Sequence, residues 1–187
     1  MTPVRPETSA RRTVSLYIGD LHAANEPTLI KTLLGSCIAV CLWDPQTQVG
    51  GMNHFMLPRS AAAADGEASR FGVHAMDLLI GELHKKGADR RRFSAKVFGG
   101  GHVLGVPEAE DSVPRQNIAF IRQFLRDEGF TVAAEDIGGR EARHVHFETH
   151  TGRAWVKRIP SEQAGSRLAR RERSAQPAAT FGDVTLF

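Results

Sequence analysis

Residues 34–55 carry the sequence LGSCIAVCLWDPQTQVGGMNHF, and this stretch predicts a β-hairpin. The run from Cys37 to Trp43 is apolar and rich in β-formers, which indicates a strand. Asp44-Pro45-Gln46-Thr47 is typical of a type I turn, because Asp favours its first position and Pro its second. Residues 48–55 then return as a second strand.

The register of this hairpin decides which side chains meet. If Asp44 pairs with Thr47, Cys37 lies directly opposite His54. Directly opposed residues of an antiparallel pair have Cβ atoms about 4.5–5.5 Å apart. Proline fits poorly into a two-residue primed turn, so we favour a longer loop or a bulge, and either would shift the register by about one or two residues.

A cysteine that follows a Gly-Ser bend, with a histidine nearby, meets the minimum requirement for a thiol nucleophile. The attacking species is the thiolate, which a neighbouring imidazole generates and stabilises. Gly35 and Ser36 allow a tight bend and place amide donors near the sulfur, as an oxyanion hole requires. We therefore expect Cys37 and His54 to be catalytic and Ser36 and Asn53 to bind substrate. The alternative is that Cys37 is a core residue, the commoner role of a lone cysteine at the start of a strand.

Catalysis by such a pair needs a third group that orients the imidazole and fixes its tautomer. Thr32 is the candidate side chain, and a backbone carbonyl is the alternative. Cys41 is expected to be a small buried hydrophobic residue, since a disulfide to Cys37 within one extended strand would span too far.

Glycine and histidine clusters suggest further sites. Gly99-Gly100-Gly101 follows a predicted strand, and it indicates either a tight turn beside the active site, which we favour, or an anion-binding nest. Gly138-Gly139 is expected to be a loop. His144, His146 and His150 suggest a metal site, but no acidic or cysteine partner stands at ligand spacing. We therefore expect neither a metal nor another cofactor.

The element pattern predicts an α+β fold, a single-domain sandwich of mostly antiparallel or mixed sheets covered by helices. One amphipathic helix is predicted from Val73 to Lys86 with Gly87 as its cap, and a second from about Pro114 to Gly129. Further strands are predicted at residues 13–18, 94–98, 130–134, 143–149 and 153–159. Residues 1–12 form an expected disordered segment, residues 13–160 the catalytic domain, and residues 161–187 a basic polar tail.

Composition narrows the function classes. The 187 residues are 41% hydrophobic and 24% charged, as in ordinary globular proteins. The chain has no apolar run long enough to span a bilayer and no signal-peptide core, so we expect a cytoplasmic protein without membrane insertion. A formal charge of +3 favours a solvated surface first and an acidic protein partner second. Nucleic acid is not expected, because the basic segments carry few interleaved aromatic residues.

At these motifs the sequence resembles the chemoreceptor glutamine deamidase family of bacterial chemotaxis, CheD. The matching motifs extend over about residues 14–160 and occur in the same order as in the family. It rests on the segments Thr32–Cys37, Cys41–Pro45, Gly51–Pro58, Arg70–Gly72, Ala95–Gly101, Asn117-Ile118, Glu135–Gly139 and Thr151-Gly152.

The resemblance implies an α/β sandwich similar to the catalytic domain of cytotoxic necrotizing factor toxins. It also implies that Cys37 and His54 convert receptor glutamines to glutamate through a thioester, with release of ammonia. The family's threonine lies six positions before the cysteine, where this chain has Lys31. Thr32 lies five before it, so either Thr32 takes the role after a small shift in register or the third member is dispensable.

Three functions therefore compete. The first is deamidation of glutamine side chains in the cytoplasmic domains of chemoreceptors. The second is a thiol protease or transglutaminase that uses the same Cys37–His54 pair. The third is a non-catalytic docking module for chemoreceptors or for a chemotaxis phosphatase, a partner that the family resemblance implies.

Overall fold

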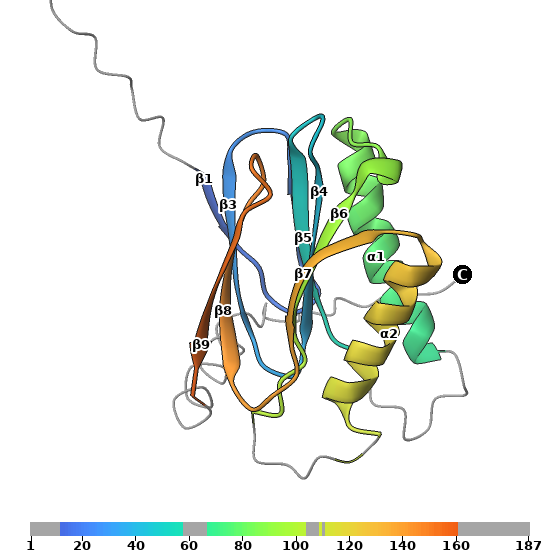
Figure 1. The fold of residues 1–187 in the computed structure, drawn as a ribbon, viewed down its shortest axis with the longest axis vertical. Coiled ribbons are helices and arrows are strands. Elements are labelled where there is room, and N and C mark those ends of the chain that lie inside the picture. Colours follow the sequence, from blue (N-terminus) through green and yellow to red (C-terminus); the bar gives the residue numbers. More distant parts are fainter. Residues whose placement is uncertain (1–11, 58–66, 104–108, 110, 161–187) are drawn as a thin grey trace, which may run out of the picture.

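The computed structural model describes residues 12–57, 67–103, 109 and 111–160, which form two stacked sheets with two helices on one side (Figure 1). Sheet A has the strand order β1-β3-β8-β9, and sheet B has the order β2-β5-β4-β6-β7. The predicted N-terminal segment up to residue 11 and the C-terminal tail 161–187 lie outside the described residues.

The two sheets are mixed, as predicted. The pairs β1–β3 and β6–β7 are parallel, and the other neighbours are antiparallel. Sheet A consists of β1 (Arg12–Ser15), β3 (Thr28–Leu34), β8 (Ala142–Glu148) and β9 (Ala154–Ile159). Sheet B consists of β2 (Leu21–Ala24), β4 (Ile38–Asp44), β5 (Val49–Phe55), β6 (Ser94–Gly99) and β7 (Thr131–Ile137). The helical elements are α1 (Glu67–Lys85), the 3-10 helix η1 (Arg90–Arg92) and α2 (Val113–Asp127).

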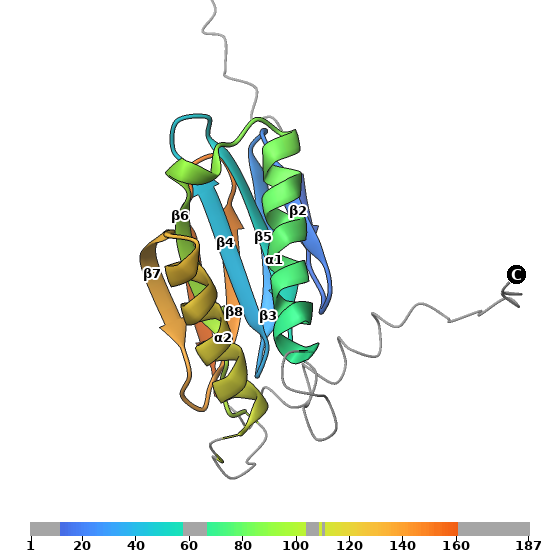
Figure 2. The ribbon, with the colours of Figure 1, turned by 90° about the vertical axis from the view of Figure 1, so that its right-hand side faces the viewer.

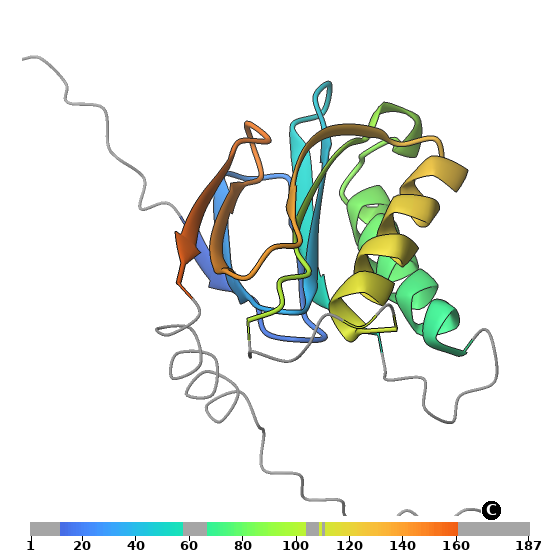
Figure 3. The ribbon, with the colours of Figure 1, turned by 60° about the horizontal axis from the view of Figure 1, so that its bottom comes forward.

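Strand β4 lies in the middle of sheet B and is buried on both faces. Ile38, Val40 and Leu42 pack into the core under the helices. Cys37, which precedes the strand, shares the core between the two sheets with Ala39 and Cys41. Helices α1 and α2 lie side by side over sheet B (Figures 2 and 3). Among the described residues, no helix covers the outer face of sheet A, so the predicted helical cover is confirmed for one sheet only.

Both predicted helices form, and α2 lies close to its expected position, whereas α1 begins at Glu67, before the predicted start at Val73. In α1 the buried stripe includes Met76, Leu79 and Leu83, and Gly87 follows with a φ of 94°. Helix α2 has proline in its first turn, and Gly129 follows it with a φ of 69°. A positive φ favours glycine, which explains both terminators. None of the described helices is long and apolar enough to cross a membrane.

The hairpin β4–β5 forms with a longer loop, as Pro45 indicated, so the register in which Asp44 pairs with Thr47 is not adopted. Asp44 pairs with Val49, so Ala39, and not Cys37, lies opposite His54. Gln48 has a φ of 56°, and its N–H donates to the Asp44 carbonyl oxygen at 2.9 Å. The turn therefore uses residues 45–48, because Pro45 needs the longer loop that a left-handed residue closes.

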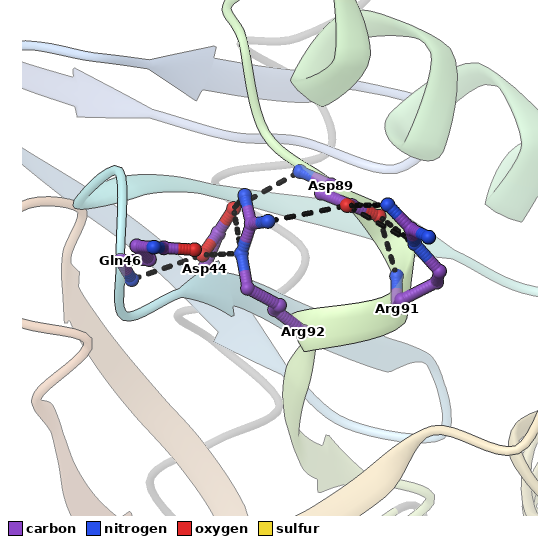
Figure 4. A network of polar contacts seen from close by, with 5 residues as sticks. All are labelled: Asp44, Gln46, Asp89, Arg91 and Arg92. Carbon is purple, nitrogen blue, oxygen red and sulfur yellow. Dashed lines mark hydrogen bonds and ion pairs between the residues drawn. The ribbon is translucent and has the colours of Figure 1, made fainter.

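A buried carboxylate anchors this turn at the end of β4 remote from Cys37 (Figure 4). The fully buried side chain of Asp44 accepts from Arg92 Nη2 at 2.6 Å and Nε at 3.0 Å. It also accepts from the backbone N–H groups of Asp89 and Gln46, both at 3.0 Å. The hydrogen bonds from Arg92 hold the pKa of Asp44 well below its usual range. The network ties the hairpin turn to η1.

Candidate active site

The structure brings together the three side chains that were predicted to be catalytic. Ala39 pairs with His54, and alternate residues of a strand share a face, so Cys37 is a diagonal neighbour of His54 on that face. Thr32 reaches the same space from β3 of the other sheet. All three residues are buried, with exposed fractions of 6% for Cys37, 4% for His54 and 0% for Thr32.

Thr32 contacts the His54 ring and also a backbone carbonyl. Its Oγ1 lies 2.8 Å from His54 Nδ1 and donates to the Leu16 carbonyl oxygen at 3.0 Å. A hydroxyl has one proton, and a carbonyl oxygen can only accept, so the Thr32 oxygen accepts from the Nδ1–H of His54. In neutral His54 this contact leaves the lone pair on Nε2, the nitrogen that can then take a proton.

Residues 16–20 make hydrogen bonds to both Thr32 and His54, a role that was not predicted from the sequence. The N–H of Gly19 donates to the His54 carbonyl oxygen at 2.8 Å, and the His54 N–H donates to the Asp20 carbonyl oxygen at 2.9 Å. Leu16, at the start of the segment, accepts from Thr32. The φ of 90° at Gly19 marks a turn that the glycine alone could have indicated.

The glycine run after β6 forms a tight turn against the segment that carries Cys37. The N–H groups of Gly100 and Gly101 donate to the carbonyl oxygens of Cys37 and Gly35, each at 2.8 Å. A side chain at Gly99, which has a φ of 110°, would collide with the Cys37 carbonyl oxygen. The favoured prediction of a tight turn is confirmed. The anion-nest alternative is wrong, because these two amides already bind carbonyl groups.

A second layer supports the glycine turn from behind. The Gly138 N–H donates to the Gly99 carbonyl oxygen at 2.9 Å, and the His102 N–H donates to that of Gly139 at 2.8 Å. Arg143, only 3% exposed, donates to the Gly138 carbonyl oxygen at 2.6 Å and pairs with Asp136 at 2.9 Å. The loop predicted at Gly138-Gly139 is therefore confirmed, and it braces the segment that carries Cys37.

Asn53 lies outside this site, contrary to the prediction that it binds substrate. Its Oδ1 accepts from the Val40 N–H at 3.1 Å, and its Nδ2 donates to the Ala75 carbonyl oxygen at 3.1 Å. Neighbouring residues of a strand point to opposite faces, so Asn53 faces helix α1 while His54 faces sheet A. Ser36 stays beside Cys37, with its hydroxyl 3.8 Å from Met56 Sδ.

The other singled-out cysteine and histidines lie away from the Thr32–His54 contact. Cys41 is 1% exposed, and burial raises the pKa of its thiol strongly, as expected of a core cysteine. His144 and His146 lie on the outer face of sheet A, with ring centroids 4.6 Å apart. Burial and the charge of Lys31 lower the pKa of His146.

The fold and the site define an α+β sandwich with a candidate cysteine-nucleophile site between its sheets. A sequence model of the family described as CheD chemotactic sensory transduction matches residues 56–158. A relative from Caulobacter sp. (strain K31) is 43% identical over 90% of this chain and 89% of its own length. One from Caulobacter vibrioides (strain NA1000 / CB15N) is 41% identical over 94% and 95%, respectively. Both relatives are named "Probable chemoreceptor glutamine deamidase CheD".

The chain belongs to the CheD family. A third relative with the same name, from Rhizobium meliloti (strain 1021), is 39% identical over 96% of this chain and 98% of its own length. Among solved structures, the hypothetical protein YfiH of Bacillus licheniformis matches 62% of this chain and 49% of its own, with a TM-score of 0.40 and 14% identity. That likeness is too distant to bear on function.

Proposed function

We propose that this chain is a chemoreceptor glutamine deamidase, with Cys37 as nucleophile, His54 as acid and base, and Thr32 as the residue that orients the imidazole. The Thr32–His54 contact of 2.8 Å next to Cys37 carries the proposal. The names of the relatives supply the substrate class, receptor glutamines. Residues 13–160 form the catalytic domain in this proposal, and the protein acts in the cytoplasm, where receptor signalling domains lie.

The first half-reaction forms a thioester. Nε2 of His54 takes the Cys37 proton, and the thiolate sulfur attacks the side-chain amide carbon of glutamine. The carbonyl electron pair moves onto oxygen, giving a tetrahedral oxyanion that backbone amides near Ser36 and Cys37 stabilise. The oxyanion collapses and breaks the carbon–nitrogen bond as His54 returns the proton to the departing ammonia.

The second half-reaction hydrolyses the thioester. Nε2 of His54 removes a proton from water, and the resulting oxygen nucleophile attacks the thioester carbon. Collapse of this second tetrahedral intermediate breaks the carbon–sulfur bond, and His54 returns its proton to the Cys37 sulfur, which leaves a carboxyl group that ionises to glutamate. The net change is glutamine plus water to glutamate plus ammonium, because the released ammonia takes up the proton that the new carboxyl group loses. Each conversion places one negative charge on the receptor helix.

The deciding experiment is mass spectrometry of a chemoreceptor cytoplasmic fragment after incubation with wild type, Cys37→Ala or His54→Ala. We expect a mass gain at specific glutamines with wild type and none with either variant. Cys41→Ala is the matched control, because that thiol is buried in the core, and it should retain activity. Cleaved or amine-crosslinked products would instead assign the site to a protease or a transglutaminase.

A wild-type protein that binds the receptor without converting any glutamine would overturn the proposed chemistry. The remaining function would be regulation by docking on receptors or on a chemotaxis phosphatase. In that case a folded Cys37→Ala protein would support normal chemotactic signalling in cells, whereas the deamidase proposal expects the variant to fail.

A further inference from the structure

Asn117 of helix α2 joins the segment before Cys37 to the segment after His54. Its side chain is fully buried. Nδ2 donates to the Ser36 carbonyl oxygen at 2.9 Å, and Oδ1 accepts from the Leu57 N–H at 2.8 Å. One carboxamide therefore fixes the position of the nucleophile relative to the end of β5.

The hydrogen bond to Ser36 also sets the direction of the Cys37 amide. The described peptides are all trans, and in a trans peptide the C=O and N–H point in opposite directions. Helix α2 lies on the outer face of sheet B (Figure 1). Because Asn117 holds the Ser36 carbonyl toward that helix, the Cys37 N–H points the other way. This is the side on which Cys37 packs between the two sheets.

We propose that Asn117 is a positioning residue that aims the Cys37 N–H at the oxyanion of the tetrahedral intermediate. The inference rests on the proposed deamidase function. An oxyanion-hole donor is effective when it is already oriented before charge develops. The Gly35 and Cys37 carbonyls are held by the glycine turn, so hydrogen bonds from two other elements fix three successive peptides around the nucleophile.

Only a carboxamide satisfies both partners of Asn117. The Ser36 carbonyl needs a donor, and the Leu57 N–H needs an acceptor. An aspartate of the same shape keeps the acceptor for Leu57, but as a carboxylate it places an oxygen against the Ser36 carbonyl. Asn117→Asp therefore removes the hydrogen bond that orients the Cys37 amide and keeps the hydrogen bond to Leu57 at the end of β5.

Asn53 provides a matched control. It is also buried, accepts from a backbone N–H (Val40) and donates to a backbone carbonyl (Ala75). It ties sheet B to α1 and makes no hydrogen bond to the Ser36–Cys37 peptide. Asn53→Ala should therefore reproduce the loss of stability in Asn117→Ala without the specific loss of catalysis.

The test compares two reactions of Cys37 in folded wild type, Asn117→Ala, Asn117→Asp and Asn53→Ala. Deamidation of the receptor fragment forms an oxyanion, whereas alkylation by iodoacetamide does not. We expect both Asn117 variants to lose about 10- to 100-fold in kcat, somewhat less than the 10²–10³ typical for deleting an oxyanion donor itself. Alkylation should stay within about twofold of wild type. Asn53→Ala should keep both rates.

Several results would overturn the inference. Wild-type kcat in folded Asn117→Ala would do so, and so would a parallel fall in alkylation and deamidation, which marks a structural role. If Asn117→Ala does not fold, Asn117→Asp provides the test in alkaline buffer, where the introduced carboxyl group is ionised. An unchanged kcat under these conditions would also refute the inference. Wild type that deamidates nothing would refute the proposed function itself and the inference with it.

Discussion

Oγ1 of Thr32 lies 2.8 Å from Nδ1 of His54, although the two residues belong to different sheets. The Thr32 hydroxyl donates to Leu16, so it accepts from the histidine ring and selects the tautomer with the lone pair on Nε2. Packing of sheet A on sheet B thus determines which tautomer neutral His54 adopts on the face that it shares with Cys37.

Replacing Thr32 by valine should lower activity more than it lowers stability. The shape is kept, but the Leu16 carbonyl and His54 Nδ1 lose their partner, which costs about 1–3 kcal/mol of unfolding free energy. We expect kcat to fall about 10- to 100-fold, a share of the contribution that general acid–base catalysis makes. Thr32→Ser should restore most of it. Equal activity in folded Thr32→Val would show that the hydroxyl is dispensable.

Iodoacetamide should modify Cys37 and spare Cys41 in the native protein. Both cysteines are buried, but burial holds the Cys41 thiol protonated, whereas Cys37 lies just before β4 on the same face as the His54 imidazole. Peptide mapping by mass spectrometry measures both sites, and denatured protein serves as the fully labelled control. His54→Ala should slow labelling of Cys37 at neutral pH. Faster labelling of Cys41 than of Cys37 would contradict the assignment.

Gly99→Ala should impair catalysis by displacing the nucleophile. A Cβ at this position would collide with the Cys37 carbonyl oxygen, and misplacement of a reacting group by about 1 Å can cost on the order of 100-fold in rate. Gly129→Ala is the matched control, because Gly129 also has a positive φ but open space around its Cβ position. It should lose stability through backbone strain and keep its kcat once folded. Similar kcat values for the two variants would refute this role.

Asp44→Asn should reduce stability at neutral pH by about 1–3 kcal/mol, because Arg92 loses its carboxylate partner. The folded-state pKa of Asp44 is lowered, so its contribution is present above the unfolded value of about 3.9 and disappears as the pH falls through the folded one. Urea unfolding across the acid range should therefore show a weaker pH dependence for the variant. Its kcat should stay unchanged, since the network lies at the far end of β4. An equally steep acid dependence in the variant would argue against this contribution.

The hairpin and both helices could be predicted because each depends on local patterns, such as apolar periodicity and glycine terminators. Strands β2 and β3 escaped prediction. β2 has only four residues, and β3 places Lys31 and Thr32 within an apolar run, which obscures the alternation of a strand. The exact register of the hairpin depends on the length of its loop, and the structure adopts the favoured longer loop, in which Gln48 takes a left-handed conformation.

In the candidate site, too, the local features could be predicted from the sequence and the long-range contacts could not. Cys37 and His54 are close in sequence and share a hairpin, so their proximity follows from local structure. The misplacement of Asn53 was avoidable, because a residue next to His54 on a strand must face the other side. The role of Asn117 was not predictable, since its partner Ser36 lies 81 residues away and only the packing of α2 on sheet B brings them together.

The strand order of sheet A also determines when the candidate site is completed during synthesis of the chain. Thr32 lies on β3, whose neighbours are β1 and β8, and β8 begins only at Ala142. On the ribosome, Cys37, His54 and Thr32 emerge early, whereas β8 follows after both helices. A nascent chain therefore carries a thiol and an imidazole without the closed sandwich that orients them. The native surroundings of Thr32 are therefore complete only after β8 has been made and has paired with β3.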